Sequence, residues 1–350
     1  MNKTGRVILM IAMLLVLLAL LFKEMMAPGV VEKDSGHRVV MGTFARVVVI
    51  ARTERAADAC IRAAFDVQER VNELMSYQRE DSELNTVNRR AFEEPVPVDP
   101  MIFEVLKLAV HFSELSDGAF DVTVGPLMDL WQKAGESNEP PTEQALAEAR
   151  AKVGFDKLIL DDQKKTVRFA VPGMKIDLGG IGKGYAVDKS VEAMQKLGAL
   201  GGMVDLGGNI RCFGRPPHGQ QYWRVGLQDP NVAPNEMGTS KPLLVLALTN
   251  ESVATSGDYR RFVTIHGEKQ SHILDTRTGQ GTKKLVSDTI IAPDATTADA
   301  LSTAVNVLGP EKGLALIERL PHVEAILIPA APNSEPLFTP GVTAYIQRNP

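Results

Sequence analysis

The chain has 350 residues, of which 44% are hydrophobic and 23% are charged, and its formal net charge is −5. That length and composition are ample for a buried core, while the acidic balance and the absence of a Lys/Arg run argue against DNA or RNA as a partner. The two cysteines, Cys60 and Cys212, are too few for a disulfide framework or a structural zinc site, and their scarcity is compatible with export.

The first predicted element is an apolar helix at the N-terminus. Lys3 and Arg6 precede an uninterrupted apolar run over residues 7–22, and Lys23 closes it. The run is longer than a signal-peptide core, and neither a small-x-small cleavage site nor a lipoprotein cysteine follows it. We interpret residues 1–26 as an uncleaved signal anchor of a bacterial inner membrane, with the body on the periplasmic side; a cleaved signal is the alternative.

After a polar, Gly/Pro-bearing linker at residues 27–37, one domain is expected over residues 38–350, beginning with a hairpin around Met41. Helical spacing of apolar residues then predicts helices over residues 54–75, 100–115, 142–153, 184–197, 297–308 and 310–320. Predicted strands cover residues 157–160, 166–171, 175–178, 203–206, 210–213, 223–227, 243–248, 262–266, 273–275 and 287–291. Short strands joined by short turns favour antiparallel sheets with helices layered outside, an α+β fold.

The segment over residues 175–188 runs from a predicted strand through glycines into a helix. Glycines let backbone N–H groups approach an anion, the helix N-terminus adds a positive dipole end, and Lys183 can offer a point charge to a phosphate. The P-loop pattern fails, because Asp177 stands where a glycine is needed and Gly184 replaces the Ser/Thr; the dinucleotide fingerprint fails on glycine spacing. A phosphate site and a structural turn both remain open.

A second candidate segment is residues 294–304. Thr296 or Thr297 is predicted to cap a helix on which Asp299 and Thr303, four residues apart, share a face. A carboxylate and a hydroxyl are hard oxygen ligands of the kind that Mg²⁺ takes, with places left for phosphate oxygens. The alternative is a solvated helix face.

Two further segments carry candidate residues. His272 stands at the start of a predicted strand and is a candidate general acid or base if it reaches the same pocket; otherwise it is structural. Over residues 118–126, Phe120 next to Asp121 suits the edge of a flat heterocycle, and a plain strand entry is the alternative.

Taken together, these segments resemble the ApbE family of FAD:protein FMN transferases, over about residues 41–309. The resemblance rests on eight blocks in family order, among them Ile176-Asp-Leu-Gly-Gly-Ile-Gly-Lys-Gly-Tyr-Ala-Val-Asp188 and Thr297-Ala-Asp-Ala-Leu-Ser-Thr303. The other blocks lie at residues 41–43, 75–85, 118–123, 205–209, 254–259 and 271–275. The family implies an ApbE-like, T-fold-like architecture.

The resemblance also implies roles for single residues. Asp299, Thr303 and the backbone carbonyl of Ala186 are implied Mg²⁺ ligands, and His272 and Asp299 are implied in catalysis. The implied FAD-contacting residues are Met41, Tyr77, Ala119, Phe120, Asp121, Lys183, Asp188 and Ile273.

The chain departs from the family pattern at a few positions. Tyr77 is shifted by one place, Thr276 replaces a common proline, and Asp288 stands where an aliphatic residue is usual. The shift puts the contact of Tyr77 with the flavin in question, whereas Thr276 removes no chemical group.

The activity that the resemblance implies is Mg²⁺-dependent transfer of FMN from FAD to a Thr or Ser hydroxyl of another protein, with AMP leaving. The expected acceptor belongs to a membrane redox complex, because the predicted anchor places enzyme and acceptor at one surface. One alternative is an FAD pyrophosphatase, in which water is the acceptor. Another is a non-catalytic FAD-binding protein, against which the presence of Asp299, Thr303 and His272 speaks.

Overall fold

The computed structural model describes residues 29–214, 216, 219–230, 232, 241–257, 262–331 and 334–346. The predicted signal anchor over residues 1–26 lies outside these residues, as does part of the block over residues 254–259. Among the described residues, no helix combines the length and the apolar character that a membrane crossing requires.

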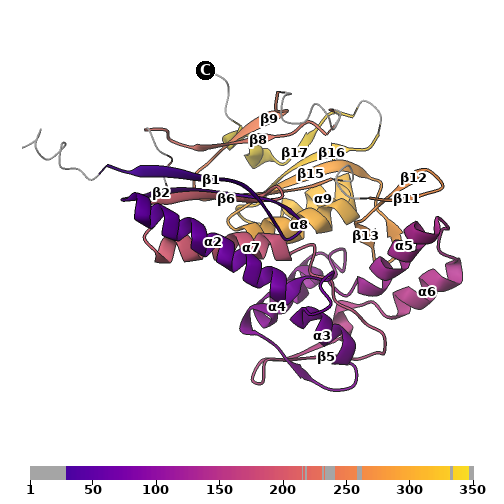
Figure 1. Cartoon of the computed structure of the whole chain (residues 1–350). Coiled ribbons are helices and arrows are strands. Elements are labelled where there is room, and N and C mark those ends of the chain that lie inside the picture. Colours follow the sequence, from indigo (N-terminus) through magenta and orange to yellow (C-terminus); the bar gives the residue numbers. More distant parts are fainter. Residues whose placement is uncertain are drawn as a thin grey trace, which may run out of the picture.

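An eight-stranded sheet forms the centre of the molecule, and every neighbouring pair of its strands is antiparallel, as predicted (Figure 1). In spatial order its strands are β1 (Val31–Val40), β2 (Thr43–Ala51), β6 (Gly201–Leu206), β7 (Asn209–Gly214), β10 (Ser252–Gly257), β15 (Leu285–Ala292), β16 (Glu324–Pro329) and β17 (Leu337–Phe338). The β1–β2 turn at Met41 confirms the predicted hairpin, with Met41 in the left-handed region at φ 50°. The predicted linker over residues 27–37 is wrong from Val31 on, because β1 begins there and pairs with β2.

The two faces of the sheet are covered differently (Figure 1). One face packs against α2 (Glu54–Met75), α7 (Gly182–Lys196), α8 (Ala295–Leu308) and α9 (Pro310–Ile317). The other face is covered by the hairpin of β8 (Trp223–Leu227) and β9 (Leu244–Leu248). Side chains alternate accordingly along β15, where Ile290 lies in the core under the helices and Ile291 in the core under the hairpin.

The chain between α2 and α7 builds a separate lobe, drawn below and to the right of these helices in Figure 1. Its elements are α3 (Glu83–Arg90), β3 (Val96–Pro97), α4 (Pro100–Leu115), α5 (Gly125–Ser137), α6 (Glu143–Ala151), η1 (Phe155–Lys157), β4 (Leu158–Asp161) and β5 (Thr166–Phe169). The small hairpins β11 (Phe262–Ile265) with β12 (Glu268–Ser271) and β13 (Leu274–Asp275) with β14 (Gln280–Gly281) lie beside α5, and η2 (Pro340–Ala344) ends the fold.

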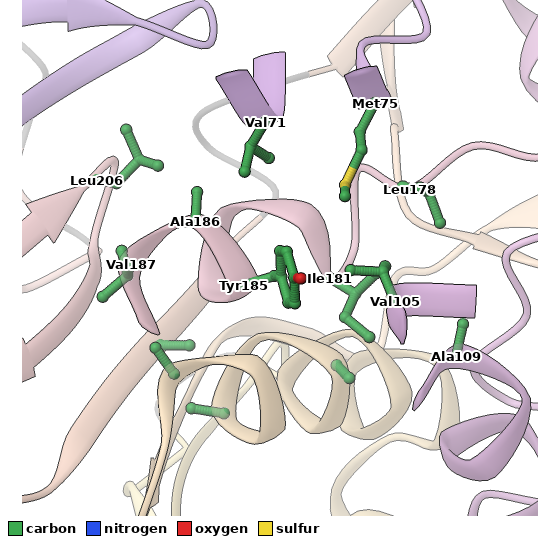
Figure 2. Packing of buried hydrophobic residues seen from close by; sticks show 14 of the residues in the cluster. Val71, Met75, Val105, Ala109, Leu178, Ile181, Tyr185, Ala186, Val187 and Leu206 are labelled. Carbon is green, nitrogen blue, oxygen red and sulfur yellow. The ribbon is translucent and has the colours of Figure 1, made fainter. Parts of the chain in front are cut away.

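The main core joins the lobe to the helix layer through α7. Figure 2 shows Tyr185 of α7 among Val105 and Ala109 of α4 and Val71 of α2. The ring of Tyr185 is buried, and its hydroxyl donates a hydrogen bond to Glu104 at 2.7 Å. This packing fixes the start of α7, and therefore the glycine loop before it, against the lobe.

The predicted strand over residues 175–178 is wrong. Lys175 makes one isolated bridge to Val124, and no strand forms. The side-chain amide of Asn88 takes the place of a strand partner, because it donates to the carbonyl of Ile176 at 3.0 Å and accepts from the Ile176 N–H at 2.7 Å. A side chain therefore satisfies backbone groups that the strand prediction assigned to a neighbouring strand.

Two helix starts also differ from expectation. The strand entry considered over residues 118–126 is wrong, because α5 begins there at Gly125. Helix α8 begins at Ala295 and is capped by Asp294, whose carboxylate accepts from the N–H of Thr297 at 2.7 Å, so neither Thr296 nor Thr297 is the cap.

Candidate functional site

The glycine loop, residues 179–184, runs into the first turn of α7 and lies directly on the face of α8 that carries Asp299 and Thr303. The N–H of Gly184 donates to Asp299 Oδ2 at 2.9 Å. A Cβ added at Gly184 would lie 2.1 Å from the carbonyl oxygen of Ala295, and one added at Gly180 would lie 3.0 Å from Thr303 Oγ1. The predicted phosphate loop and the predicted metal-binding face therefore form one site.

Charge at this site is concentrated on an ion pair between the buried Asp299 and the partly exposed Lys183. Asp299 is 4% exposed, and the ammonium of Lys183 lies 3.1 Å from its Oδ1. Lys183 also stands in the first turn of α7, whose N-terminal N–H groups carry a partial positive charge. An anion placed here would be attracted by the ammonium of Lys183 and by the helix N-terminus. The carboxylate of Asp299 is able to hold a metal ion beside it.

The donor set fits Mg²⁺. Asp299 and Thr303 supply two hard oxygen ligands, fewer than the roughly six that Mg²⁺ takes, so phosphate, water and backbone oxygens would complete the shell. Over the described residues there is no cluster of three or more His, Cys, Asp or Glu side chains suited to a metal. Mg²⁺ does not require such a cluster, because it is commonly bound by one or two carboxylates together with substrate phosphates.

Two other predicted segments pack onto the same helix. A Cβ at Gly180 would lie 3.2 Å from the ring of Phe120, which places that ring beside the loop. Ala119 and Ile273 form a small buried cluster with Val307 of α8. The structure thus brings residues from three distant parts of the chain to the C-terminal half of α8.

A cavity of about 450 Å³ adjoins this site and brings Tyr77 and His272 together. Asp177 links the cavity to the glycine loop, since it lines the cavity and its Oδ1 accepts from the N–H of Gly179 at 2.8 Å. The remaining lining residues are Gln78, Met128, Trp131, Gln132, Gly135, Glu136, Thr264, Gln270, Ser271 and Leu274. Its volume and its aromatic and thioether walls suit a flat heterocycle.

The hydroxyl of Tyr77 is fixed from outside the cavity. It donates to Asp129 Oδ1 at 2.6 Å, and Lys175 pairs with the other oxygen of that carboxylate. Burial, and then the hydrogen bond to Asp129, raises the pKa of Tyr77 well above its ordinary value. The phenol therefore stays neutral, and its ring is the part available to a ligand.

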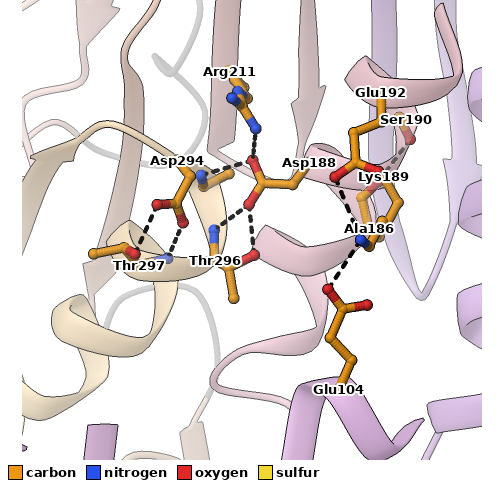
Figure 3. A network of polar contacts seen from close by, with 11 residues as sticks. Glu104, Ala186, Asp188, Lys189, Ser190, Glu192, Arg211, Asp294, Thr296 and Thr297 are labelled. Carbon is orange, nitrogen blue, oxygen red and sulfur yellow. Dashed lines mark hydrogen bonds and ion pairs between the residues drawn. The ribbon is translucent and has the colours of Figure 1, made fainter. Parts of the chain in front are cut away.

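Asp188 is placed at the start of α8 and does not line the cavity with Tyr77 (Figure 3). Its carboxylate accepts from the N–H groups of Ala295 at 2.9 Å and Thr296 at 2.8 Å, and from Arg211 Nη1 at 2.6 Å. Burial raises the pKa of Asp188, and Arg211 opposes that rise. Asp188 joins α7 to α8, and its contact with FAD stays a prediction.

Ala186 is fully buried, and its carbonyl accepts a hydrogen bond from Ser190 Oγ at 2.7 Å (Figure 3). Its role as a metal ligand stays a prediction. Asp121 is engaged locally, because its carboxylate accepts from the N–H groups of Thr123 at 2.8 Å and Phe155 at 3.0 Å, and burial raises its pKa. Met41 lies at the β1–β2 turn, outside the lining of the cavity, and its role also stays a prediction.

The cavity wall formed by α5 was not predicted from the sequence. Met128, Trp131 and Gln132 all come from this helix. A signal was present, because Leu127, Trp131 and Ala134 recur at helical spacing and a proline stands in the first turn.

Comparisons with known proteins point to one family. The model of the ApbE family matches residues 41–327. A curated FAD:protein FMN transferase of Treponema pallidum is 36% identical over 313 residues, with 85% of each chain covered, and that of Escherichia coli is 31% identical over 288 residues, covering 80% of this chain and 79% of the relative.

Two solved structures have a fold similar to that of this chain. The ApbE protein of Thermotoga maritima superposes with a TM-score of 0.79 at 30% identity, over 91% of this chain and 100% of that one. The flavin transferase ApbE of Vibrio cholerae gives 0.76 at 28% identity, over 91% and 99%. The expected mixture of helices with antiparallel sheets is thus common to this chain and these structures.

Proposed function

The chain belongs to the ApbE family, and from this membership we propose that it is a Mg²⁺-dependent FAD:protein FMN transferase. The observation that carries the proposal is the contact of the glycine loop with Asp299 and Thr303, beside a cavity large enough for a flavin ring. We assign the phosphates of FAD to Lys183 and the start of α7, and the flavin ring to the cavity with Tyr77.

The reaction is a phosphoryl-type displacement. The oxygen of an acceptor Thr or Ser hydroxyl attacks the phosphorus on the FMN side, the bond from that phosphorus to the bridging oxygen breaks, and AMP leaves with the bridging oxygen. The hydroxyl proton passes to His272 or to a neighbouring carboxylate. Mg²⁺, when bound, supplies positive charge against the two phosphates. Lys183 orients the pyrophosphate, and the flavin ring is held away from water.

The acceptor in this proposal is an extracytoplasmic part of a membrane redox complex. The apolar run over residues 7–22, preceded by Lys3 and Arg6, motivates the placement of the body outside the cytoplasm. Protease added to spheroplasts should digest the body. If the body is digested only after the cells are lysed, the placement is incorrect.

The test uses the full-length chain with FAD, MgCl₂ and membranes from source cells that lack this gene. Covalent flavin is then read as fluorescence on denaturing gels. We expect labelling by the wild type, loss of about 10²-fold or more with His272→Ala, and no loss with His111→Ala, an exposed histidine on α4. FMN and AMP without labelling would indicate a pyrophosphatase, and bound FAD without products would indicate a binding protein; either contradicts the proposal.

A further inference from the structure

A buried carboxylate, Asp288, anchors a chain of hydrogen bonds behind the proposed site. Asp288 is 0% exposed and lies on the face of the sheet under α8. It accepts from Ser302 Oγ at 2.8 Å and from Asn306 Nδ2 at 2.9 Å. Both donors belong to α8, the helix that carries Asp299 and Thr303.

The chain of hydrogen bonds continues from Asn306 to the segment that bears His272. Asn306 Oδ1 accepts from the hydroxyl of Thr282 at 2.6 Å, and the N–H of Thr282 donates to the carbonyl of Ile273 at 2.9 Å. On the other side of His272, Ser271 Oγ accepts from the N–H of Ile273 at 3.1 Å. The backbone next to His272 is therefore tied to α8 through one amide side chain.

Each hydrogen bond of this chain has a defined donor and acceptor. Asn306 Nδ2 donates to Asp288 Oδ2, so the amide turns its oxygen toward Thr282. The hydroxyl of Thr282 must then donate. Because Asn306 and Thr282 are both buried, losing either bond leaves a buried polar group without its partner and weakens the alignment of the segment.

The same helix therefore holds both halves of the proposed site. Asp299 and Thr303 face the glycine loop, while Asn306 holds the segment of His272. Resting on the proposed flavin transfer, we propose that Asn306, oriented by Asp288, is a positioning residue: it sets His272 relative to Asp299 and Thr303. It touches neither the cavity nor the loop, and its effect passes through Thr282.

The test removes one hydroxyl from the chain of hydrogen bonds, that of Thr282. Thr282→Val keeps the shape of the side chain and removes the donor to Asn306, whereas Thr282→Ser keeps the donor. The control is Thr289→Val. Thr289 follows Asp288 on β15 and points to the opposite face of the sheet, and the substitution removes its 2.9 Å hydroxyl contact with Thr255. Thr282→Val loses the bond to Asn306 and a 3.5 Å contact with Ser271 Oγ, and Thr289→Val loses one partly buried bond, so the melting temperature of each variant should fall.

Transfer is measured with full-length variants, FAD as the varied substrate, MgCl₂, and membranes from source cells that lack the gene. We expect Thr282→Val to lower kcat by about 10-fold or more with KM for FAD within about 2-fold, and Thr282→Ser and Thr289→Val to keep kcat within about 2-fold. Thr282→Ala removes the same hydroxyl if valine is not accommodated.

Three results would overturn the inference: equal kcat for Thr282→Val and Thr289→Val, an equal loss for Thr282→Ser, or a change confined to KM. If the wild type itself transfers no flavin, the proposed function fails and this inference with it. If the wild type transfers flavin and Thr282→Val matches Thr289→Val, only the positioning role fails.

Discussion

At the scale of single residues, Gly184 decides how close α7 and α8 come. A Cβ at this position would lie 2.1 Å from the Ala295 carbonyl oxygen and 2.8 Å from the Cβ of Asp299. Both obstacles are firmly held, one being helix backbone and the other the stem of a buried side chain. The hydrogen bond from the Gly184 N–H to Asp299 needs this close approach.

Substituting Gly184 should therefore be costly in a way that substituting its neighbour Gly182 is not. A Cβ at Gly182 would meet nothing closer than the Cβ of Leu178 at 4.0 Å. We expect Gly184→Ala to lower the free energy of unfolding by about 3 kcal/mol, and Gly182→Ala to change it by about 1 kcal/mol or less. Urea denaturation of both variants measures this. Equal effects at the two positions would contradict the close approach.

At the scale of elements, helices with clear caps and periodic apolar faces were predictable. The range predicted for α2 matches the observed one, and so does the range predicted for α4, which Asp99 caps. The segment over residues 175–178 was not predictable, because a distant side chain, Asn88, replaces a strand partner there. Local pattern fixes an element only where its backbone partners are also local.

The β1–β2 hairpin should give a pH-dependent contribution to stability. Hydrogen bonds from Arg46 hold the pKa of Asp34 below its usual range. A carboxyl whose pKa is lower in the folded state contributes stability above its unfolded pKa, and that stability is lost as the pH falls through the lowered value. Both side chains are partly exposed, so the contribution is small, on the order of 1 kcal/mol or less.

We therefore expect the difference in unfolding free energy between the wild type and Asp34→Asn to be constant above about pH 5 and to shrink below about pH 4. Denaturant titrations from pH 2 to 7 provide the measurement. A difference that stays the same across this range would show that the ion pair does not couple to folding.

At the scale of the whole molecule, the site exists only because the fold gathers distant segments onto α8. The sequence identified Lys183, Asp299, Thr303 and His272 as candidates one block at a time. It did not give the contact of the loop with α8 or the wall that α5 adds to the cavity, since both depend on tertiary packing. The link from Asp288 through Asn306 likewise depends on how α8 lies over β15.

The central claim is that Asp299 forms part of a Mg²⁺-dependent flavin-transfer site. The most direct measurement compares covalent flavin labelling by the full-length wild type, Asp299→Asn and the control Asp162→Asn over a range of MgCl₂ concentrations, with FAD and membranes lacking the enzyme. Asp162 is an exposed carboxylate paired with Lys107, so its variant should match the wild type. We expect Asp299→Asn to lose labelling by about 100-fold or more and to need more Mg²⁺. Labelling by Asp299→Asn at the wild-type rate and Mg²⁺ dependence would contradict the assignment.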